Sequence, residues 1–422
     1  FSLISGDSLA WSCAGRAGTH GVAGPRPRLL IRGAGVLYLV IMKVTFRFTA
    51  VTVLFAAFTL ASTTQATVVY DLVPVGDPGN AADVGGFGSV AYEYHIGKYE
   101  VTIGQYTEFL NAVAKTDTHS LYNVGMATYL NFAGISRAGN DGSYIYSVIN
   151  NGGDSSNRPI YGVSWFNAAR FANWMANGQP TGAQSIRTTE NGAYNVNGAT
   201  SGNAMAKNAI NPNTFAAPTF YIPTENEWYK AAYYSPEHGG IGSPGYFLYA
   251  TQSDAVPGNV IGGAANQANY YNGVLSVTQS ANFELSQNYL TDVGAFSGSG
   301  SFYGTFDQSG NVEEWNDRTV GGDSERGFRG GAYWDGTGSM SRKTLGTAHP
   351  DSTCGFRLAS PNSSAPTGPV ILTVEKTTAL LSRQWTPVPI TANMITPEGE
   401  LNVGALTNTH EFYRLKGRIE AE

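Results

Sequence analysis

Charged side chains are scarce in this chain. Asp, Glu, Lys and Arg make up 13% of its 422 residues, roughly half the share found in ordinary globular proteins. The formal net charge is −6, and nucleic-acid-binding proteins need a clustered basic face. The composition therefore gives no electrostatic reason to expect a nucleic-acid partner. Solubility must come from Asn, Ser, Thr and Tyr, which together with 52 glycines suits a loop-rich exported protein.

Cysteine is nearly absent as well. The two cysteines are Cys13 and Cys354. Cys13 precedes the first methionine, Met42, in a stretch (residues 1–41) that we interpret as a non-native upstream extension, with a genuine long leader as the alternative. The remaining chain then holds one thiol and cannot form an internal disulfide. We expect Cys354 to be buried and inert, and stability to come from the core, tight turns and a metal ion.

Long hydrophobic runs are missing after residue 60. The run Phe48–Leu60 follows basic residues close to Met42, and Thr64–Ala66 offers small residues at signal-peptidase spacing. The sequence therefore predicts a signal peptide over residues 42–66 and a mature chain starting at Thr67. The run is shorter than the roughly 20 residues that span a bilayer. We expect a secreted, periplasmic or cell-surface protein with no membrane span in the mature chain.

Several common catalytic patterns are also missing. The chain has no Gly-x-Ser-x-Gly elbow and no phosphate-binding loop. Its histidines show no His-x-x-x-His or His-x-Glu spacing, so the local sequence does not support an iron site. Glu225 and Glu227 fall in the first turn of a predicted helix, where the helix dipole explains acidic residues.

Three short helices are predicted from capping patterns and apolar spacing. Thr102–Gln105 is a capping box, and apolar residues then recur at helical intervals up to Val113. A second helix opens at Ser164, and a third follows Pro223 with a second capping box at Thr224–Glu227. Strands or extended segments are predicted at residues 68–73, 92–99, 160–163 and 220–222.

Polar, glycine-rich stretches separate these elements. Residues 177–218 contain Asn191-Gly192 and Asn197-Gly198, which are strong hairpin-turn signals. Residues 252–301 have a similar composition. Loops of this length are functional, ordered by ligands or disordered.

The C-terminal part of the chain has a different texture. Pro361–Pro369 is rich in Pro and Ser and predicts a linker. Three short strands are expected beyond it, at Val370–Val374, Trp385–Val388 and Phe412–Leu415. We interpret residues 362–422 as a linker and a small β appendage.

Five sequence elements, in order, resemble those of the formylglycine-generating enzyme family, also called sulfatase-modifying factors. They cover roughly residues 90–360, and an ordered match of this kind is more specific than any single motif. The resemblance implies an α+β, loop-rich variant of the C-type lectin fold over residues 67–361. The elements are Tyr99–Tyr106 (YEVTIGQY), Arg158–Trp165 (RPIYGVSW), Ile222–Trp228 (IPTENEW), Tyr303–Trp315 (YGTFDQSGNVEEW) and Arg329–Arg357, which begins RGGAY and ends GFR.

The family's catalytic cysteine pair has no counterpart here. The resemblance places the two cysteine positions at Asp335 and Met340, an active-site serine at Ala332 and a tyrosine at Ser339. Copper-dependent oxidation of a substrate cysteine requires soft thiolates that hold Cu(I). A carboxylate and a lone thioether do not replace them, so copper binding is not expected.

The resemblance also implies a structural calcium ion. Its ligands would be the Asp307 and Glu314 side chains and the carbonyl oxygens of Gly310 and Val312. Calcium takes such mixed carboxylate and carbonyl oxygens. The alternative is that Asp307 caps a turn and Glu314 pairs with a nearby arginine. Asn269 and Tyr270 resemble the start of a second family calcium site, but the sequence after them matches too loosely.

Two functional hypotheses follow. In the first, the protein is a calcium-stabilised binding module whose Tyr-, Asn-, Ser- and Gly-rich loops recognise an extracellular glycan or protein, with a sulfatase as one candidate. In the second, it is an enzyme that oxidises a sulfatase cysteine to formylglycine or runs another reaction in the same groove, near Asp335, Arg342 and His349. Glu313 replaces an aromatic residue of the family's groove, which favours the first hypothesis.

Overall fold

The computed structural model describes residues 68–203, 205–320, 324–350 and 352–361 in full, and the backbone of three strands at 370–377, 386–388 and 412–419. Residues 62–363 form one compact unit, and the C-terminal strands belong to a second unit. The predicted upstream extension, signal peptide and linker fall outside the described residues. Within those residues, no helix combines the length and apolar character needed to cross a membrane.

Three helices form where the capping patterns predict them. They are α1 (Ile103–Val113), α3 (Trp165–Ala176) and α4 (Glu225–Tyr233). Both predicted capping boxes are complete, with reciprocal bonds between side chain and backbone, and each contributes on the order of 1 kcal/mol. A fourth helix, α2 (Gly125–Thr128), is a single turn without a side-chain cap. It therefore lacks the capping pattern from which the other three helices were predicted.

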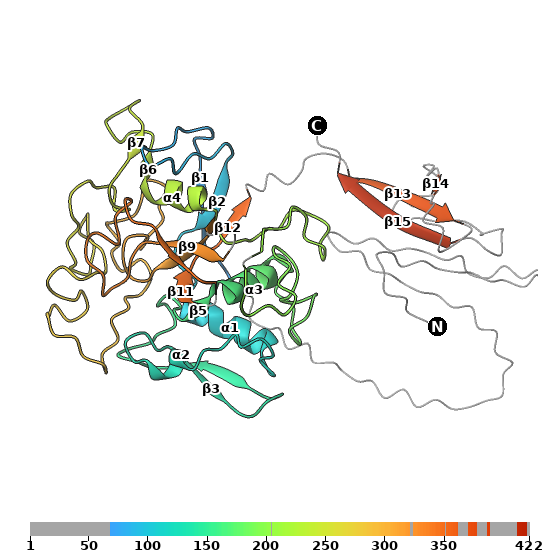
Figure 1. Ribbon diagram of the computed structural model, residues 1–422, viewed down its shortest axis with the longest axis horizontal. Coiled ribbons are helices and arrows are strands. Elements are labelled where there is room, and N and C mark those ends of the chain that lie inside the picture. The colour runs from blue at the N-terminus through green and yellow to red at the C-terminus, as the bar shows by residue number, and fades with distance from the viewer. Residues whose placement is uncertain are drawn as a thin grey trace, which may run out of the picture. The chain divides into compact units, whose positions relative to one another are not determined.

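The strands are short and form several small sheets (Figure 1). One sheet has the order β1-β2-β12 and is antiparallel. A five-stranded sheet has the order β10-β9-β8-β11-β5, in which β8 and β11 run parallel. Two hairpins, β3-β4 and β6-β7, complete the main unit. The strands are β1 (Leu72–Val75), β2 (Tyr94–Gly97), β3 (Ile135–Ala138), β4 (Ile145–Val148), β5 (Val163–Ser164), β6 (Tyr234–Ser235), β7 (Gly245–Tyr246), β8 (Glu314–Val320), β9 (Glu325–Arg329), β10 (Gly346–Ala348), β11 (Thr353–Phe356) and β12 (Ala359–Pro361).

The first strand begins four residues later than predicted. Residues 68–73 were expected to be extended, whereas β1 covers Leu72–Val75. The reason is that the backbone of Val68 bonds to the Gln179 side chain, through N–H to Oε1 at 2.7 Å and Nε2 to the carbonyl at 2.8 Å. An amide side chain distant in sequence thus replaces a strand partner. The second predicted strand is present as the shorter β2.

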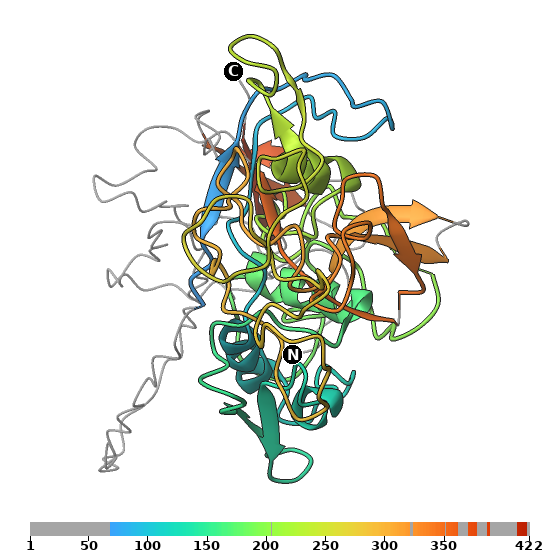
Figure 2. The same ribbon diagram turned by 90° about the vertical axis from the view of Figure 1, so that its left-hand side faces the viewer.

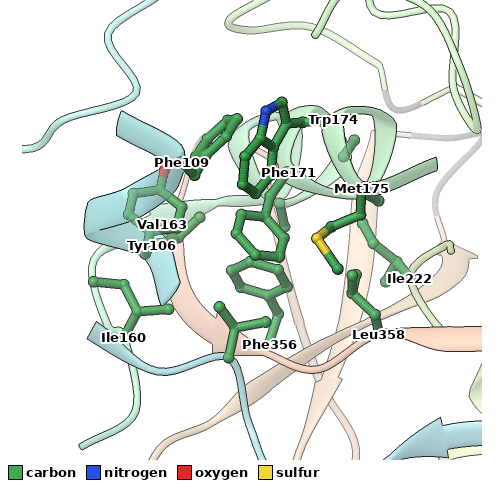
Figure 3. Close-up of a cluster of buried hydrophobic side chains, with 14 of the residues drawn as sticks. Tyr106, Phe109, Ile160, Val163, Phe171, Trp174, Met175, Ile222, Phe356 and Leu358 are labelled. Carbon is green, nitrogen blue, oxygen red and sulfur yellow. The ribbon is translucent and has the colours of Figure 1, made fainter. Parts of the chain in front are cut away.

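Aromatic rings build the centre of the core (Figure 3). Phe171 on α3 lies 5.2 Å from Phe109, 5.7 Å from Trp174 and 5.4 Å from Phe356, measured between ring centroids. Its ring also stacks on that of Tyr106 at 5.9 Å. These rings come from α1, α3 and β11, so a small number of large side chains joins elements that are too short to pack by themselves.

The two ends of the main unit differ. Helix α4 lies near the sheet of β1, β2 and β12, whereas α1, α2 and the β3 strand lie at the opposite end (Figure 1, Figure 2). The five-stranded sheet runs between them, with β11 and β5 close to α1 and α3 (Figure 1). The fourth motif element ends in β8 of this sheet, and the fifth contains β10 and β11.

The Asn-Gly pairs do not form regular hairpins. Asn197 and Gly198 adopt the positive φ angles of a tight turn, 45° and 83°, but the described part of residues 177–218 contains no named strand. Asparagine side chains hold this segment instead. The Asn173 amide donates to the Thr189 and Tyr194 carbonyls at 2.7 and 2.8 Å. Side-chain amides have taken the backbone groups that a hairpin ladder would use.

The structure describes the backbone of three strands in the C-terminal part of the chain. They are β13 (Val370–Thr377), β14 (Thr386–Val388) and β15 (Phe412–Ile419), and they form an antiparallel sheet in the order β14-β13-β15. β13 and β15 pair along their full length, from Val370 opposite Ile419 to Thr377 opposite Phe412.

Replacing Phe171 by alanine should be among the most damaging core substitutions. It removes a fully buried ring that contacts four other rings, and such a change costs about 3–5 kcal/mol. Denaturant titration of Phe171→Ala and of the control Ile241→Ala measures this. Ile241 is 95% exposed, so its variant should stay within about 0.5 kcal/mol of wild type. Equal effects of the two substitutions would contradict the assignment of the core.

Candidate functional site

A buried ion pair joins the two strands that carry the fourth and fifth motif elements. β8 and β11 run parallel, with Glu314 opposite Gly355. The Arg357 guanidinium contacts both Glu314 oxygens, Nη2 to Oε1 at 2.6 Å and Nε to Oε2 at 2.7 Å. Trp228 on α4 donates to the same Oε2 at 2.9 Å. Glu314, Arg357 and Trp228 are completely buried, so this two-pronged pairing is shielded from solvent.

Two further carboxylates lie close to this pair. Glu100 Oε2 is 3.9 Å from Arg357 Nη2 and has no hydrogen-bond partner in the described structure. Burial and the neighbouring Asp307 carboxylate raise the pKa of Glu100 well above its usual value. Burial also raises the pKa of Asp307 to about 6. We call Glu100, Asp307, Glu314 and Arg357 the Arg357 cluster; it contains three carboxylates and one guanidinium.

The predicted calcium ligands lie in and next to this cluster. Asp307, at φ 63°, accepts a bond from the Gly294 N–H through Oδ2 at 2.6 Å. Gly310, at φ 94°, passes so close to Asn269 that an added Cβ would be 2.2 Å from its carbonyl oxygen. Val312 is buried beyond it. Both parts of the alternative interpretation are therefore present: Asp307 fixes a turn, and Glu314 pairs with an arginine.

The surroundings nevertheless suit a hard cation. One guanidinium leaves the three carboxylates of the Arg357 cluster in excess, and two buried oxygens, Glu100 Oε2 and Asn269 Oδ1, lack partners in the described part of the chain. Oxygen atoms of this kind are calcium ligands. In the described residues, no three His, Cys, Asp or Glu side chains are arranged to hold a metal ion. The ligand set with two carbonyls stays a prediction.

The two positions that the motif resemblance assigns to the family's cysteine pair carry other side chains with structural contacts. Asp335 accepts a bond from the Ala332 N–H through Oδ2 at 2.9 Å. Met340 is completely buried among Tyr249, Ala268 and Tyr270. Neither side chain offers a thiol, and each has a role in local packing.

The one cysteine in the described residues is buried next to Glu313. Cys354 is 3% exposed, and burial raises the pKa of its thiol well above the usual value. Burial likewise raises the pKa of Glu313 to about 7, with a smaller contribution from Asp335 and an opposing hydrogen bond with Tyr161. A thiol that resists ionisation is a poor nucleophile and a poor metal ligand, so the expectation of an inert Cys354 agrees with its surroundings.

Asp335, Arg342 and His349, the polar residues of the enzyme hypothesis, do not contact one another in the interactions described here. Arg342 forms an ion pair with Asp83, and the hydroxyl of Tyr229 donates to the same carboxylate at 2.5 Å. Asp335 is engaged with Ala332, as described above, and His349 is exposed. Their closeness in sequence does not produce a shared site among these contacts.

The remaining motif residues pair with one another. Arg329 of the Arg-Gly-Gly element forms a buried ion pair with Glu225 of the third element, and its Nη1 donates to the Thr344 carbonyl at 2.7 Å. The helix dipole alone was the sequence-based explanation for Glu225. The ion pair with Arg329 adds a tertiary reason that no local pattern could reveal.

The model of the sulfatase-modifying factor enzyme 1-like domain matches residues 89–361, well over half of the chain. The chain belongs to this family. The resemblance drawn from the five motif elements is thereby confirmed, and the domain has the family's loop-rich architecture of mixed helices and small sheets. A comparison with curated protein sequences gave no match.

Three solved structures are similar to the family domain. CarF shares 24% identity at a TM-score of 0.39, covering 69% of this chain and 98% of CarF. Treponema denticola variable protein 1 shares 18% at 0.42, covering 71% and 97%. PvdO from Pseudomonas aeruginosa shares 14% at 0.35, covering 69% and 92%. These values are too low to support a functional conclusion.

Sequence reasoning missed Glu100 and Asn269 as site residues. Glu100 belongs to the first motif element, but no spacing rule says that its carboxylate is buried without a partner. Asn269 was noted only as the start of a loosely matching second calcium site. Its amide donates to the Tyr289 carbonyl at 2.9 Å, while its Oδ1 is left unpaired.

Removing the guanidinium should destabilise the domain strongly. Arg357→Met leaves the buried carboxylates of Glu100 and Glu314 and the half-buried one of Asp307 without this counter-charge, and breaking a buried pair in this way costs about 3–5 kcal/mol. The control is Arg187→Met, since Arg187 is exposed; surface substitutions of this kind change stability by about 0.5 kcal/mol or less.

A double variant makes the test specific. In Arg357→Met/Glu314→Gln the loss should be smaller than the sum of the two single losses, because both partners are gone. Denaturant titration measures wild type, both single variants and the double variant, and strictly additive losses would contradict the pairing.

Proposed function

We propose that this protein is a binding module of the sulfatase-modifying factor family that has no copper-thiolate oxidase activity. One observation carries the proposal: the two positions that match the catalytic cysteines are Asp335 and Met340. The first holds a turn and the second fills a small core. The remaining described thiol, Cys354, is buried with a raised pKa. The scaffold of the family is retained while the atoms that hold copper are replaced.

The proposal includes the setting of the module. We infer a secreted, periplasmic or cell-surface protein with a C-type-lectin-like domain, stabilised by calcium and followed by a small β appendage. The ligand would be a glycan or a protein outside the cytoplasm, with a sulfatase as one candidate. The loops that could contact it carry Tyr, Asn, Ser and Gly, residues that adapt to many partners.

The alternative is an enzyme acting in the same groove. The observation that favours it is Glu313, half-buried, with a pKa raised to about 7 beside Asp335. Carboxylates of this kind also occur at catalytic sites. The alternative requires a reaction that these two side chains could perform without thiolates, or an altered route to formylglycine.

An activity assay separates the two functions. A cysteine-containing sulfatase peptide is incubated with the protein, Cu(I) and oxygen and analysed by mass spectrometry. We expect no conversion of the cysteine to an aldehyde, because no thiolate pair holds copper. Circular dichroism confirms that the tested protein is folded. Conversion that disappears in Cys354→Ser would overturn the proposal and would show that a single thiol suffices.

Calcium removal should lower the stability of the domain. A bound ion contributes about 2.7 kcal/mol when its concentration is 100 times the dissociation constant, so EDTA should reduce the melting temperature by several degrees and added calcium should restore it. Magnesium serves as the matched cation control. A melting temperature that is the same with and without EDTA would contradict the calcium assignment.

Glu100→Gln gives a second, sharper readout of the same ion. Without calcium, the substitution removes one of the excess buried carboxylates, whose Oε2 has no hydrogen-bond partner in the described residues, and should stabilise the domain. With calcium, it removes a charge that attracts the ion and should weaken the stabilising effect of calcium. The sign of the change in melting temperature should therefore differ between EDTA and calcium buffers. A change of the same sign and size in both buffers would indicate that Glu100 does not sense a cation.

A further inference from the structure

Seven aromatic rings make contact one after another across four separate segments of the domain. We call Tyr129, Phe132, Tyr161, Trp334, Tyr333, Tyr289 and Phe283, in this order, the aromatic face. Their successive ring centroids are 5.7, 5.0, 5.6, 4.5, 5.5 and 5.1 Å apart. Both terminal rings and one central ring reach solvent: Tyr129 is 64% exposed, Phe283 50% and Trp334 38%. Leu130 and Leu285, at 39% and 79%, extend the apolar surface.

Hydrogen bonds hold the segments of the aromatic face together. The Asn131 amide donates to the Glu284 and Gln287 carbonyls, both at 2.9 Å. The Tyr289 N–H donates to the Asn131 carbonyl at 3.0 Å. Tyr289 and Tyr333 stack beneath the exposed rings and are 1% and 3% exposed. The surface is therefore ordered before any ligand arrives, which reduces the entropy lost on binding.

The charged side chains within the segments that carry the aromatic face are all carboxylates. Half-buried Glu313 and Asp335 lie next to Tyr161. The segments that build this surface also contain Glu284 and Asp292 and contain no Lys, Arg or His. These segments are residues 121–136, 159–169, 270–296, 308–313 and 330–341. A partner that fits such a surface carries apolar groups and positive charge.

The arginines that flank these segments have partners elsewhere, among them Arg170, which pairs with Glu190. Arg137 pairs with Asp117, Arg329 with Glu225 and Arg342 with Asp83. Arg158 is buried and donates to the carbonyls of Asn151 and Gly152 at 2.6 and 3.0 Å. Each of these guanidinium groups is therefore engaged with a group outside the aromatic face.

Elsewhere the protein itself places cations on its aromatic rings. The Arg137 guanidinium lies 4.7 Å from the Tyr122 ring centroid and 4.3 Å from that of Tyr144. Lys207 lies 3.4 Å from the Tyr221 ring. Among the cation–π contacts of the described residues, none involves a ring of the aromatic face. Its exposed rings thus remain open to a cation from a partner.

We propose that the aromatic face binds a basic protein segment, whose Lys or Arg side chains lie over the exposed rings and reach Glu313 and Asp335. This inference rests on the proposed function as a binding module and names the chemistry of its ligand. Arginine is the better match, because its planar guanidinium stacks on aromatic rings and pairs with carboxylates at the same time.

Titration calorimetry with two cysteine-free peptides tests the proposal. One peptide alternates Arg with Gly, and the other has Glu in place of every Arg. The arginine peptide should bind and the glutamate peptide should not, and binding should weaken as salt concentration rises. Trp334→Ala should weaken binding about tenfold or more, as expected when a central aromatic anchor is truncated. Glu313→Gln should also weaken it, whereas the conservative Trp334→Phe should retain most of the affinity.

Matched controls distinguish binding at the aromatic face from nonspecific binding to acidic or apolar side chains elsewhere on the surface. Phe215→Ala removes an aromatic ring that is 85% exposed, and Glu237→Gln removes an exposed carboxylate, both outside the five segments. Neither should change binding by more than about twofold, the usual range for surface substitutions away from a contact. Melting curves confirm that each variant is folded, and Tyr129→Ala, on the exposed end of the aromatic face, replaces Trp334→Ala if that variant is unstable.

Three results would overturn the proposal. They are equal binding of both peptides, arginine-peptide binding that Trp334→Ala leaves unchanged, and binding of a neutral oligosaccharide such as cellohexaose in place of the peptide. The last result would make the aromatic face a sugar platform. Because neither peptide contains cysteine, these outcomes are independent of the oxidase assay. Conversion of the sulfatase peptide would refute the proposed function, while failure of the arginine peptide would refute only the ligand class.

Discussion

The buried pairing of Arg357 with Glu314 is the interaction on which the rest of the domain depends. Glu314 opens β8 and Arg357 directly follows β11, so the pairing fixes the parallel register of two central strands. The same guanidinium donates to the carbonyls of Gly97 at 3.0 Å and Phe306 at 2.8 Å. One side chain thus satisfies backbone groups from the end of β2 and from the loop before β8. In a fold with so little regular structure, such a side chain does what a long sheet ladder does elsewhere.

Burying this pair creates the electrostatic problem that the proposed calcium ion would solve. Three carboxylates share one guanidinium, those of Glu100 and Glu314 are buried, and Glu100 Oε2 has no hydrogen-bond partner among the described atoms. An unpaired charge in such surroundings is strongly unfavourable unless the group is protonated or a cation arrives. The raised pKa values of Glu100 and Asp307 correspond to protonation of these carboxylates. A bound calcium ion would be the alternative, and it would restore the charged forms.

Features that depend on neighbouring residues could be predicted from the sequence, whereas features that depend on contacts between distant segments could not. The capping boxes at Thr102 and Thr224 depend on neighbouring residues, so both were predicted to the residue. The position of β1 depends on Gln179, more than a hundred residues away. The expected hairpins near Asn191 and Asn197 lost their backbone partners to asparagine side chains. In each failure, a side-chain amide took the place of a strand. The candidate site shows the same division, because the motif elements located the replaced cysteine pair but could not show that Glu100 is buried beside Arg357.

The separation between scaffold and chemistry explains how one family can support different functions. The Arg357–Glu314 pair, the Arg329–Glu225 pair and the capping boxes all lie within the motif elements, and none of them requires a thiol. A replacement of the cysteine pair by Asp335 and Met340, which the motif resemblance implies, would therefore leave these interactions intact. Under the proposed binding function, the carboxylates and aromatic rings beside Asp335 would take part in recognition without being needed for the buried ion pairs. Selection for a ligand can reshape such a surface without disturbing the buried ion pairs that hold it in place.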